Sequence, residues 1–294
     1  MAVIAPLDFS QGMARRKWRG RAFYAMCLAA VGIALGMLAV LLVYLLVQGV
    51  TRIDWQFLTN FPSRHPEQAG IQSALLGSVY LVVIAGFSAF VLGVGAAIYL
   101  EEYARRHWLH RLVQVNIANL AGVPSIVYGL LGLQIFVRSM DLGKSLLAGG
   151  FTLGLLVLPI IIIAAEEAIR AVPSSVREGG YALGSTRWQI VWHLVLPQAF
   201  PGILTGVILA VSRALGETAP LIVVGALAFV PFSPDSPLSR FSALPIQIFN
   251  WTSRPQAGFH EAAAAGIIVL LAVLLAMNAA AVILRNKFQS GSEG

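Results

Sequence analysis

The chain has 294 residues, of which 58% are hydrophobic and only 11% are charged. A soluble domain carries about 25% charged residues, so this composition excludes an ordinary soluble protein. The formal net charge of +7 comes from Lys and Arg beside apolar runs, which indicates membrane orientation and argues against nucleic acid as a partner. Cys27 is the only cysteine and the five histidines lack metal-ligand spacing, so we expect no disulfide framework and no metal.

Six apolar segments are long enough to cross the hydrocarbon core, which needs about 20 helical residues. They are residues 22–47, 72–100, 113–138, 146–169, 200–230 and 262–284. The first follows a basic cluster, but it is too long for a signal peptide and lacks a small-residue cleavage site, so we expect it to be retained. The sequence therefore predicts an all-α polytopic membrane protein with six transmembrane helices.

Counts of Lys and Arg predict the orientation of these helices. The two tails and the loops 101–112 and 170–198 hold 13 of them, whereas the other three loops hold 6. Both termini are therefore expected in the cytoplasm, with a multi-pass protein in a bacterial inner membrane. The predicted layout is a cytoplasmic tail 1–21, a first helix 22–47, a periplasmic loop 48–70, a transmembrane domain 71–285 and a cytoplasmic tail 286–294.

Glycine and proline predict how these helices pack and bend. Small residues recur four apart, a spacing that lets helices approach closely, at Gly32/Gly36, Gly150/Gly154 and Gly202/Gly206. Pro124 and Pro159 lie inside predicted spans and predict kinks, with the freed carbonyls satisfied by neighbouring groups.

The predicted cytoplasmic loop 173–197 is amphipathic, and its sequence predicts two short helices around a glycine, which together form a protruding elbow. Pro173 and Ser174 suit a helix start, residues 175–183 have helical character, and Gly184 breaks the helix. A second helix is predicted to end at Leu196, with Pro197 and Pro201 marking re-entry into the membrane. Four side chains are expected to enter a groove on a partner: Tyr181, Leu183, Trp188 and Val191.

The same loop resembles the EAA loop of permease subunits of ATP-binding-cassette importers. The resemblance rests on Glu178-Gly179-Gly180, Gly184 and Leu194-Val195-Leu196-Pro197. The usual Ala-Ala is here Gly179-Gly180, and the usual Ile is Leu194; the spacing of Glu, Gly and Leu-Pro is intact. The resemblance implies a type I importer permease fold and a coupling helix that docks on the ATPase, with Arg177, Glu178, Tyr181, Gly184 and Trp188 as coupling residues.

Three further stretches resemble the phosphate-specific permeases of the Pst system, and the A subunit more than the C subunit. They are LAGVPSIVYGLLGL (120–133), EEAIRAVPSSVREGGYALG (166–184) and SRALGETAPL (212–221). The resemblance covers roughly residues 70–285 and implies a heterodimer with a paralogous permease. It also implies a dimeric cytoplasmic ATPase, a periplasmic phosphate-binding protein and inorganic phosphate as partners, within membrane lipid.

The chain itself is not expected to be an enzyme. GKS at 143–145 is its nearest approach to a P-loop, but the required earlier glycine is Arg138. We therefore expect no catalytic residue and no cofactor in this chain, and ATP with Mg²⁺ in the partner ATPase.

Arg213 and Glu217 lie four residues apart inside the fifth predicted span. If that span begins near Ile203, a rise of about 1.5 Å per residue places them ~15 Å and ~21 Å along it, near the midplane. An arginine there costs about 2.5–3.5 kcal/mol, so it should face protein or water. Either the pair fixes helix packing, or Arg213 contacts a phosphate in a bidentate way while Glu217 positions and moderates it. Gly216 and Pro220 beside the pair are predicted to act as a hinge.

Other ionisable residues have simpler interpretations. Glu166 and Arg170 are four apart and predict an ordinary helix-end pair. Glu101 and Glu102 are expected at a solvated interface, with Arg105 and Arg106 after them. The phosphate-specific permeases often have an arginine shortly before the pair that corresponds to Glu166 and Glu167. This chain has Ile-Ile-Ile-Ala-Ala at 161–165, so the resemblance does not place a second arginine in the pathway of this subunit.

Alternatives stay open from sequence alone. The chain can be the paralogous phosphate permease, or a permease for another oxyanion such as sulfate or molybdate. An ion-coupled secondary transporter would use Arg213 and Glu217 for coupling, but it would not need the elbow. An intramembrane enzyme is disfavoured because no nucleophile with a base, paired carboxylates or metal ligands lie in the spans.

Overall fold

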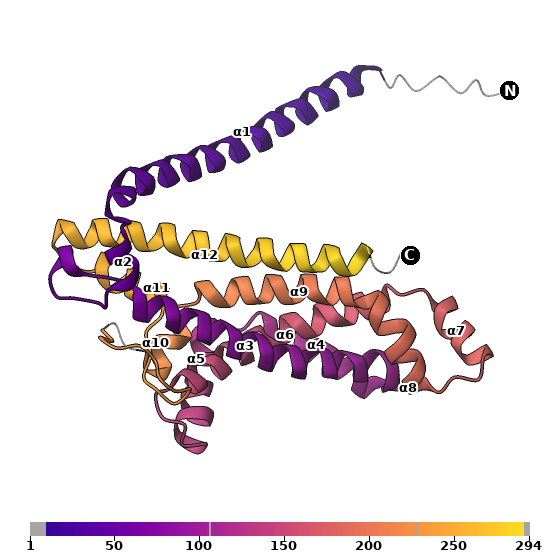
Figure 1. Cartoon of the computed structure of the whole chain (residues 1–294). Coiled ribbons are helices and arrows are strands. Elements are labelled where there is room, and N and C mark those ends of the chain that lie inside the picture. The colour runs from indigo at the N-terminus through magenta and orange to yellow at the C-terminus, as the bar shows by residue number, and fades with distance from the viewer. Residues whose placement is uncertain (1–9, 106, 227–228, 291–294) are drawn as a thin grey trace.

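In the computed structural model, which describes residues 10–105, 107–226 and 229–290, every regular element is a helix (Figure 1). The long helices are α1 (Ser10–Gly49), α3 (Gln72–Ile98), α6 (Leu146–Arg170), α9 (Leu196–Gly216) and α12 (Ala257–Ser290). The shorter ones are α2 (Trp55–Thr59), α4 (Trp108–Ala121), α5 (Ser125–Gly132), α7 (Ser174–Ala182), α8 (Arg187–Ile190), α10 (Ala219–Val224) and α11 (Leu244–Thr252). Two 3-10 turns are η1 (Val50–Arg52) and η2 (Pro66–Gln68), and three π-helical turns are η3 (Tyr99–Tyr103), η4 (Leu133–Ser139) and η5 (Val191–Val195).

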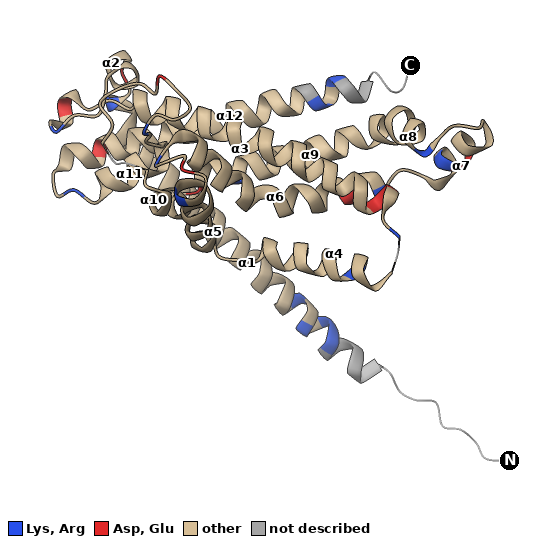
Figure 2. Cartoon of the chain, turned by 90° about the horizontal axis from the view of Figure 1, so that it is seen from below, with Lys and Arg blue, Asp and Glu red and all other residues tan. Residues whose placement is uncertain are grey.

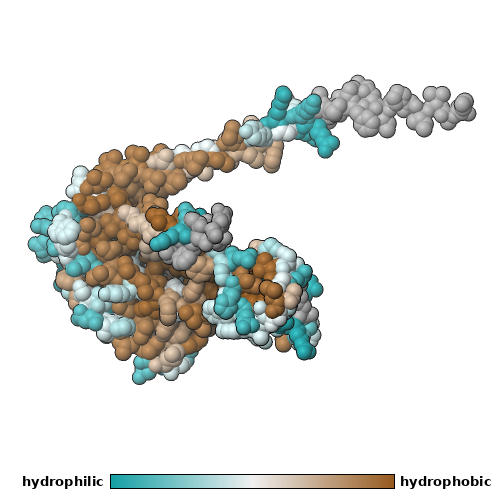
Figure 3. All heavy atoms as spheres, turned by 45° about the vertical axis from the view of Figure 1, so that its right-hand side comes forward, coloured by the Kyte–Doolittle hydropathy of each residue, from teal (hydrophilic) through white to brown (hydrophobic). Residues whose placement is uncertain are grey.

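Five stretches of the described chain are long and apolar enough to cross a membrane, and a bent pair makes six if it is counted as one span. Charged residues gather toward the ends of the helix bundle and along the start of α1, and the middle of the bundle carries few of them (Figure 2). Figure 3 shows a largely apolar surface over the bundle and α1, with hydrophilic residues where α1 begins. This distribution is what a bilayer requires of spanning helices.

The first helix runs apart from the rest of the chain and meets α12 near its own end (Figure 1). Its residues 16–44 are all exposed. At Gly49 a Cβ would lie 2.7 Å from the backbone of Ala264, so the two helices touch there. A Cβ on Gly32 or Gly36 would meet no other helix of the described chain within 4 Å, so within this chain these glycines do not form the close helix contact that their spacing suggests.

The helices α3, α6 and α9 form the core, and both other glycine pairs lie at its contacts. A Cβ on Gly150 or Gly154 would meet side chains of α3, at Ile84 and Ser88. A Cβ on Gly202 or Gly206 would meet α6, at Ala168 and Ala164. The small residues therefore set close distances between the core helices.

The third predicted span, 113–138, is wrong as a single helix. α4 and the stretch Ser125–Ser139 are bent by 103° around Gly122, Val123 and Pro124. Pro124 has no N–H, and its ring would clash with the carbonyl of Leu120 if the helix continued. The Tyr128 hydroxyl donates a hydrogen bond of 2.7 Å to that carbonyl, so a neighbouring turn satisfies the group at the break.

The fifth predicted span, 200–230, is wrong at both ends. The helix is continuous from Arg187 to Gly216, through α8, η5 and α9, so the second elbow helix does not stop at Leu196. The π turn is closed by a bond from the Leu196 N–H to the Val191 carbonyl. This wider turn precedes Pro197, whose ring is incompatible with a regular α-helical turn behind it.

Candidate functional site

Arg213 lies in the last turn of α9, not in the middle of a continuous span. The predicted depth of Arg213 near the midplane assumes a helix start at Ile203, whereas the continuous helix starts at Arg187, so that depth does not follow from its position along the helix. The last carbonyls of a helix carry partial negative charge, which stabilises a cation in that turn. The end of α9 therefore offsets part of the charge of Arg213.

The helix ends at Gly216 because Pro220 follows four residues later. A proline at that position lacks the N–H that would bond the Gly216 carbonyl, and its ring would strike that carbonyl. Glu217 is extended (φ −78°, ψ 127°), and Pro220 stands in the first turn of α10. The two residues predicted as a hinge, Gly216 and Pro220, thus lie on the two sides of a break in the helix.

Arg213 and Glu217 form a contact across this break. The Arg213 Nε lies 3.4 Å from the Glu217 Oε1, with the arginine side chain 48% exposed and the glutamate side chain 18% exposed. Within the described part of the chain, Nη1 and Nη2 of Arg213 have no hydrogen-bond partner. The glutamate thus holds one edge of the guanidinium and leaves the other edge, the fork that matches an oxyanion, open.

The helix break at Gly122–Pro124 lies close in space to the break between Gly216 and Pro220. α5 packs on α10 so tightly that a Cβ on Gly129 would lie 2.8 Å from the Pro220 Cα. The preceding residue, Tyr128, is 4% exposed and braces the first break. Arg213 and Glu217 therefore stand where two discontinuous helices meet.

The elbow is built from local signals in its sequence. α7 ends where Gly184 adopts a left-handed conformation (φ +76°), which glycine adopts without strain. α8 then begins with a reciprocal capping box between Thr186 and Gln189. The approach of α7 to α8 is close, since a Cβ on Gly180 would lie 2.8 Å from Ile190 and 2.9 Å from Leu194.

The outer face of the elbow is rich in exposed apolar and aromatic side chains. Tyr181, Leu183 and Trp188 are 49%, 87% and 59% exposed, and Glu178 is exposed beside them. Val191, which we expected on this face, is 1% exposed and packs inward. Its neighbour Trp192 takes that place, 49% exposed and edge-on to Trp188 at 5.3 Å between ring centroids. The four-residue spacing of the two tryptophans could have indicated this from the sequence.

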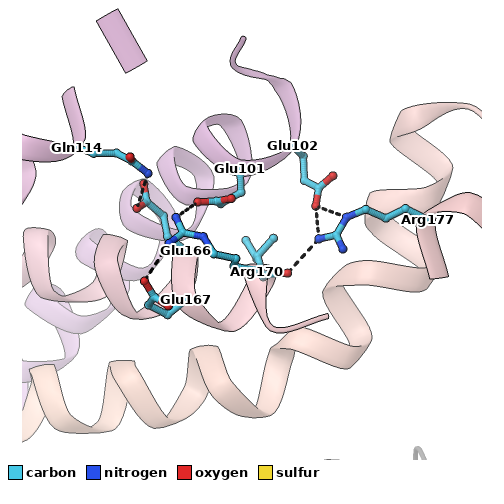
Figure 4. Close-up of polar contacts among 8 residues, drawn as sticks. Glu101, Glu102, Gln114, Glu166, Glu167, Arg170 and Arg177 are labelled. Carbon is cyan, nitrogen blue, oxygen red and sulfur yellow. Dashed lines mark hydrogen bonds and ion pairs between the residues drawn. The ribbon is translucent and has the colours of Figure 1, made fainter. Parts of the chain in front are cut away.

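Arg177 differs from the other predicted coupling residues because its guanidinium points inward (Figure 4). Nε and Nη2 donate to Glu102 Oε1 at 3.0 and 2.7 Å. Nη1 donates to the Val172 carbonyl at 2.8 Å, and Nη2 to the Ile169 carbonyl at 2.9 Å. Arg177 therefore joins α7 to the end of α6 and to the π turn that follows α3.

The prediction of a solvated pair of glutamates is wrong. The side chains of Glu101 and Glu102 are 7% and 9% exposed, and Arg105 is not a partner of either among the described contacts. Arg106 lies outside the described residues. Glu101 instead forms an ion pair with Arg170, and Glu102 with Arg177 (Figure 4). Burial of a carboxylate is tolerated when a cation and hydrogen bonds accompany it.

The predicted pair of Glu166 with Arg170 is also replaced by other contacts. Arg170 bonds Glu101 and, at 3.1 Å, Glu167. Glu166 lies 3.5 Å from the amide of Gln114 on α4, and its Oε1 is buried with no hydrogen-bond partner among the described residues. No group of three His, Cys, Asp or Glu in the described chain could hold a metal ion.

Comparisons with known proteins identify relatives over most of the chain. A family model described as binding-protein-dependent transport system inner membrane component matches residues 89–290. The probable ABC transporter permease protein YqgI of Bacillus subtilis (strain 168) is 33% identical over 266 residues, which cover 85% of this chain and 90% of that protein. The phosphate transport system permease protein PstA of Mycobacterium leprae (strain TN) is 36% identical over 248 residues, 82% and 80% of the two chains.

A solved structure has a similar fold at low sequence identity. A chain in the crystal structure of a bacterial alginate ABC transporter, in complex with an alginate pentasaccharide-bound periplasmic protein, matches with a TM-score of 0.66 and 15% identity. The match covers 93% of this chain and 96% of that one. This likeness concerns the arrangement of helices alone.

Proposed function

The chain belongs to the family of binding-protein-dependent transport system inner membrane components, and on that premise we propose that it is a permease subunit of an ATP-driven, high-affinity importer of inorganic phosphate. It is a multi-pass membrane component with the helical fold of type I importer permeases. In the proposal it forms half of the transmembrane pathway beside a paralogous permease. A periplasmic binding protein delivers phosphate, and a separate dimeric ATPase supplies the energy.

The observation that carries the choice of substrate is the open guanidinium of Arg213 at the end of α9. Phosphate near neutral pH is an anion with several oxygen acceptors, and a planar guanidinium can bind two of them at once. The phosphate permeases among the relatives point to the same anion. The open edge formed by Nη1 and Nη2 is the part of the site that would meet it.

Glu217 is proposed to tune this site. A bare arginine would hold a multivalent anion tightly, whereas conduction requires release as well as entry. The contact with Glu217 at 3.4 Å offsets part of the cationic charge and fixes the direction of the side chain. Because Glu217 lies after the end of α9, a change in the break at Gly216 and Pro220 would move the carboxylate relative to Arg213 and alter the affinity for phosphate.

The elbow is proposed to couple this site to the ATPase. The aromatic and aliphatic residues on its outer face, with Glu178 beside them, form a protruding surface suited to a hydrophobic groove on another protein. ATP and Mg²⁺ would be bound by that partner. The second elbow helix, α8, continues through η5 into α9, so the helix that begins at the ATPase would end at Gly216, just after Arg213.

The test is the variant Arg213→Gln in a strain that lacks the native gene. Glutamine keeps a similar length and removes the charge, so we expect phosphate uptake to be lost while the complex still assembles. The matched control is Arg138→Gln, which removes an exposed arginine from η4. Normal uptake of phosphate by the Arg213→Gln variant would refute the assignment of the site. Normal uptake of phosphate by the deletion strain itself would refute the proposed substrate.

A further inference from the structure

We propose that the Glu102–Arg177 ion pair is a positioning device that transmits movement of the elbow to the ends of α3 and α6. The inference rests on the proposed coupling of this chain to a separate ATPase. It gives Arg177 a different role from that of the elbow residues on the outer face. Arg177 is a positioning residue that acts inside the permease, and the outer residues form the docking surface.

The first observation is the number and direction of the bonds made by Arg177. Its three nitrogens make four hydrogen bonds of 2.7 to 3.0 Å, to one carboxylate and two backbone carbonyls. The carbonyls belong to Ile169 and Val172, at the end of α6 and just beyond it. A planar guanidinium with donors in a fixed fork resists both rotation and sliding, which an ammonium group does not. A displacement of α7 therefore pulls on the end of α6 and on Glu102 together.

The second observation is that two consecutive carboxylates share one turn. Glu101 and Glu102 lie in the π turn η3 at the end of α3, and both side chains are less than one-tenth exposed. Glu102 binds the elbow through Arg177, while Glu101 binds α6 through Arg170 (Figure 4). Since a π turn is a local irregularity that often marks a functional site, η3 is a suitable place for a helix end to adjust. The turn thus links three elements through two arginines.

The third observation extends this network toward the substrate site. Glu166, one turn before Arg170 on α6, meets Gln114 on α4 at 3.5 Å. α4 is half of the bent pair whose other half, α5, packs on Pro220 directly after the Arg213–Glu217 contact. Packed helices and polar contacts that form one contiguous chain are the physical means by which two distant sites influence each other. The ion pair is the point where the elbow joins that chain.

The experiment compares coupling, not activity alone. The complete complex of both permeases and the ATPase is reconstituted in proteoliposomes, with its binding protein and inorganic phosphate added. The variants are Glu102→Gln, Arg177→Gln and the double variant, together with Arg177→Lys. The readouts are basal ATP hydrolysis, hydrolysis stimulated by the loaded binding protein, phosphate moved per ATP, and thermal stability. The matched control is Glu167→Gln, which alters a 66% exposed carboxylate that contacts Arg170 but neither Glu102 nor Arg177.

We expect each single Gln variant to lower the ratio of stimulated to basal hydrolysis by about tenfold, because contiguous networks alter coupling by this order. The ratio in the double variant should match that of the more impaired single variant, since both changes remove the same Glu102–Arg177 contact. Arg177→Lys should restore only part of the ratio, and Glu167→Gln should leave it unchanged.

Three results would overturn the proposal: an unchanged ratio in both single variants, losses that add in the double variant, or a fall in thermal stability with the ratio preserved. The last would show a purely structural pair. The stimulation ratio does not depend on which anion is carried. A wild-type complex that is stimulated but moves no phosphate would therefore refute the proposed substrate, and the ratio in the variants would still decide the role of the pair.

Discussion

Exchanging the sizes of two residues at the contact between α6 and α9 tests the packing that holds Arg213 in place. A Cβ on Gly206 would lie 2.3 Å from the Cβ of Ala164. Carbon atoms in contact are about 3.5–4.0 Å apart, so Gly206→Ala forces the two helices apart by more than about 1 Å. The double variant Gly206→Ala with Ala164→Gly moves the methyl group across the interface. Its nearest neighbours would then be the backbone of residue 164 at 3.6 and 3.9 Å, which is ordinary contact.

The expected energies follow from this geometry. Overpacking costs about 1–3 kcal/mol, and a clash this short belongs at the upper end. Alanine regains up to about 1 kcal/mol of helix propensity, which leaves Gly206→Ala destabilised by about 2 kcal/mol. Ala164→Gly loses that propensity and about 0.8 kcal/mol of methyl burial. In the double variant the propensity and burial changes cancel and the clash is absent, so we expect stability close to that of the wild type. The two single losses of about 2 kcal/mol each then give a coupling energy of about 4 kcal/mol, above the range of about 0.5–3 kcal/mol found for most contacting pairs.

The assay is thermal unfolding of the purified complex in detergent, with each of the four proteins measured under one protocol. A destabilisation of 1 kcal/mol lowers Tm by about 2–4 °C in a protein of this size class, so Gly206→Ala should unfold about 4–8 °C below the wild type. The double variant should return to within about 2 °C of it. A double variant that shows the sum of the single losses, or a Gly206→Ala protein with an unchanged Tm, would refute the close contact between α6 and α9.

Three further predictions concern the breaks, the elbow and the division of labour. Tyr128→Phe removes a 2.7 Å hydrogen bond to the Leu120 carbonyl. That carbonyl keeps its bond from the Val123 N–H, so we expect Tm to fall by an amount equivalent to about 1 kcal/mol. An unchanged Tm would show that the hydroxyl does not brace the break. Gly184→Val should lose binding-protein-stimulated ATP hydrolysis, because a left-handed backbone conformation costs a residue with a side chain about 1–2 kcal/mol, whereas Gly184→Asn should keep most of that hydrolysis. No atom lies within 4 Å of a Cβ added at Gly184, so equal losses in both variants would show that the side chain blocks docking and that backbone strain is not the cause. The chain purified alone should hydrolyse no ATP. ATP hydrolysis that copurifies with this chain after contaminating ATPases have been removed would contradict the proposed separation of permease and ATPase.

The sequence predicted the class of fold and the features whose causes are local. The all-α polytopic class is confirmed, because long apolar segments determine spans directly. The elbow forms where a helix start, a glycine and a capping box lie within a few residues of each other. Prolines marked the positions of both breaks, but a proline alone does not determine whether a helix kinks or ends. That outcome depends on whether a neighbour such as Tyr128 can satisfy the freed carbonyl and whether another segment fills the bend.

The contacts between distant residues could not be predicted, and the charged cluster shows why. The sequence predicts a pair between Arg170 and Glu166, four residues earlier on the same helix. In the fold, Arg170 and Arg177 pair with Glu101 and Glu102, which are 69 and 75 residues away. The sequence positions of the two glutamates, in η3 after α3, contain no information about which helix end they will meet. Only the packing of α3 on α6, set by glycine contacts along both helices, brings those carboxylates to the elbow.

The contact between Arg213 and Glu217 could be predicted from their spacing, although the helix is not continuous through both residues. A four-residue spacing brings two side chains together whether the second residue is in the last turn or just beyond it, and the measured contact of 3.4 Å reflects this. The surroundings differ from those of a mid-span arginine, however. At a helix end the charge is already balanced in part by free carbonyls and by a carboxylate, so the site needs no further counter-ion in order to be stable in the membrane. In the proposed function, an anion that arrives at Nη1 and Nη2 would compete with this existing balance, which would let the site release phosphate as well as attract it.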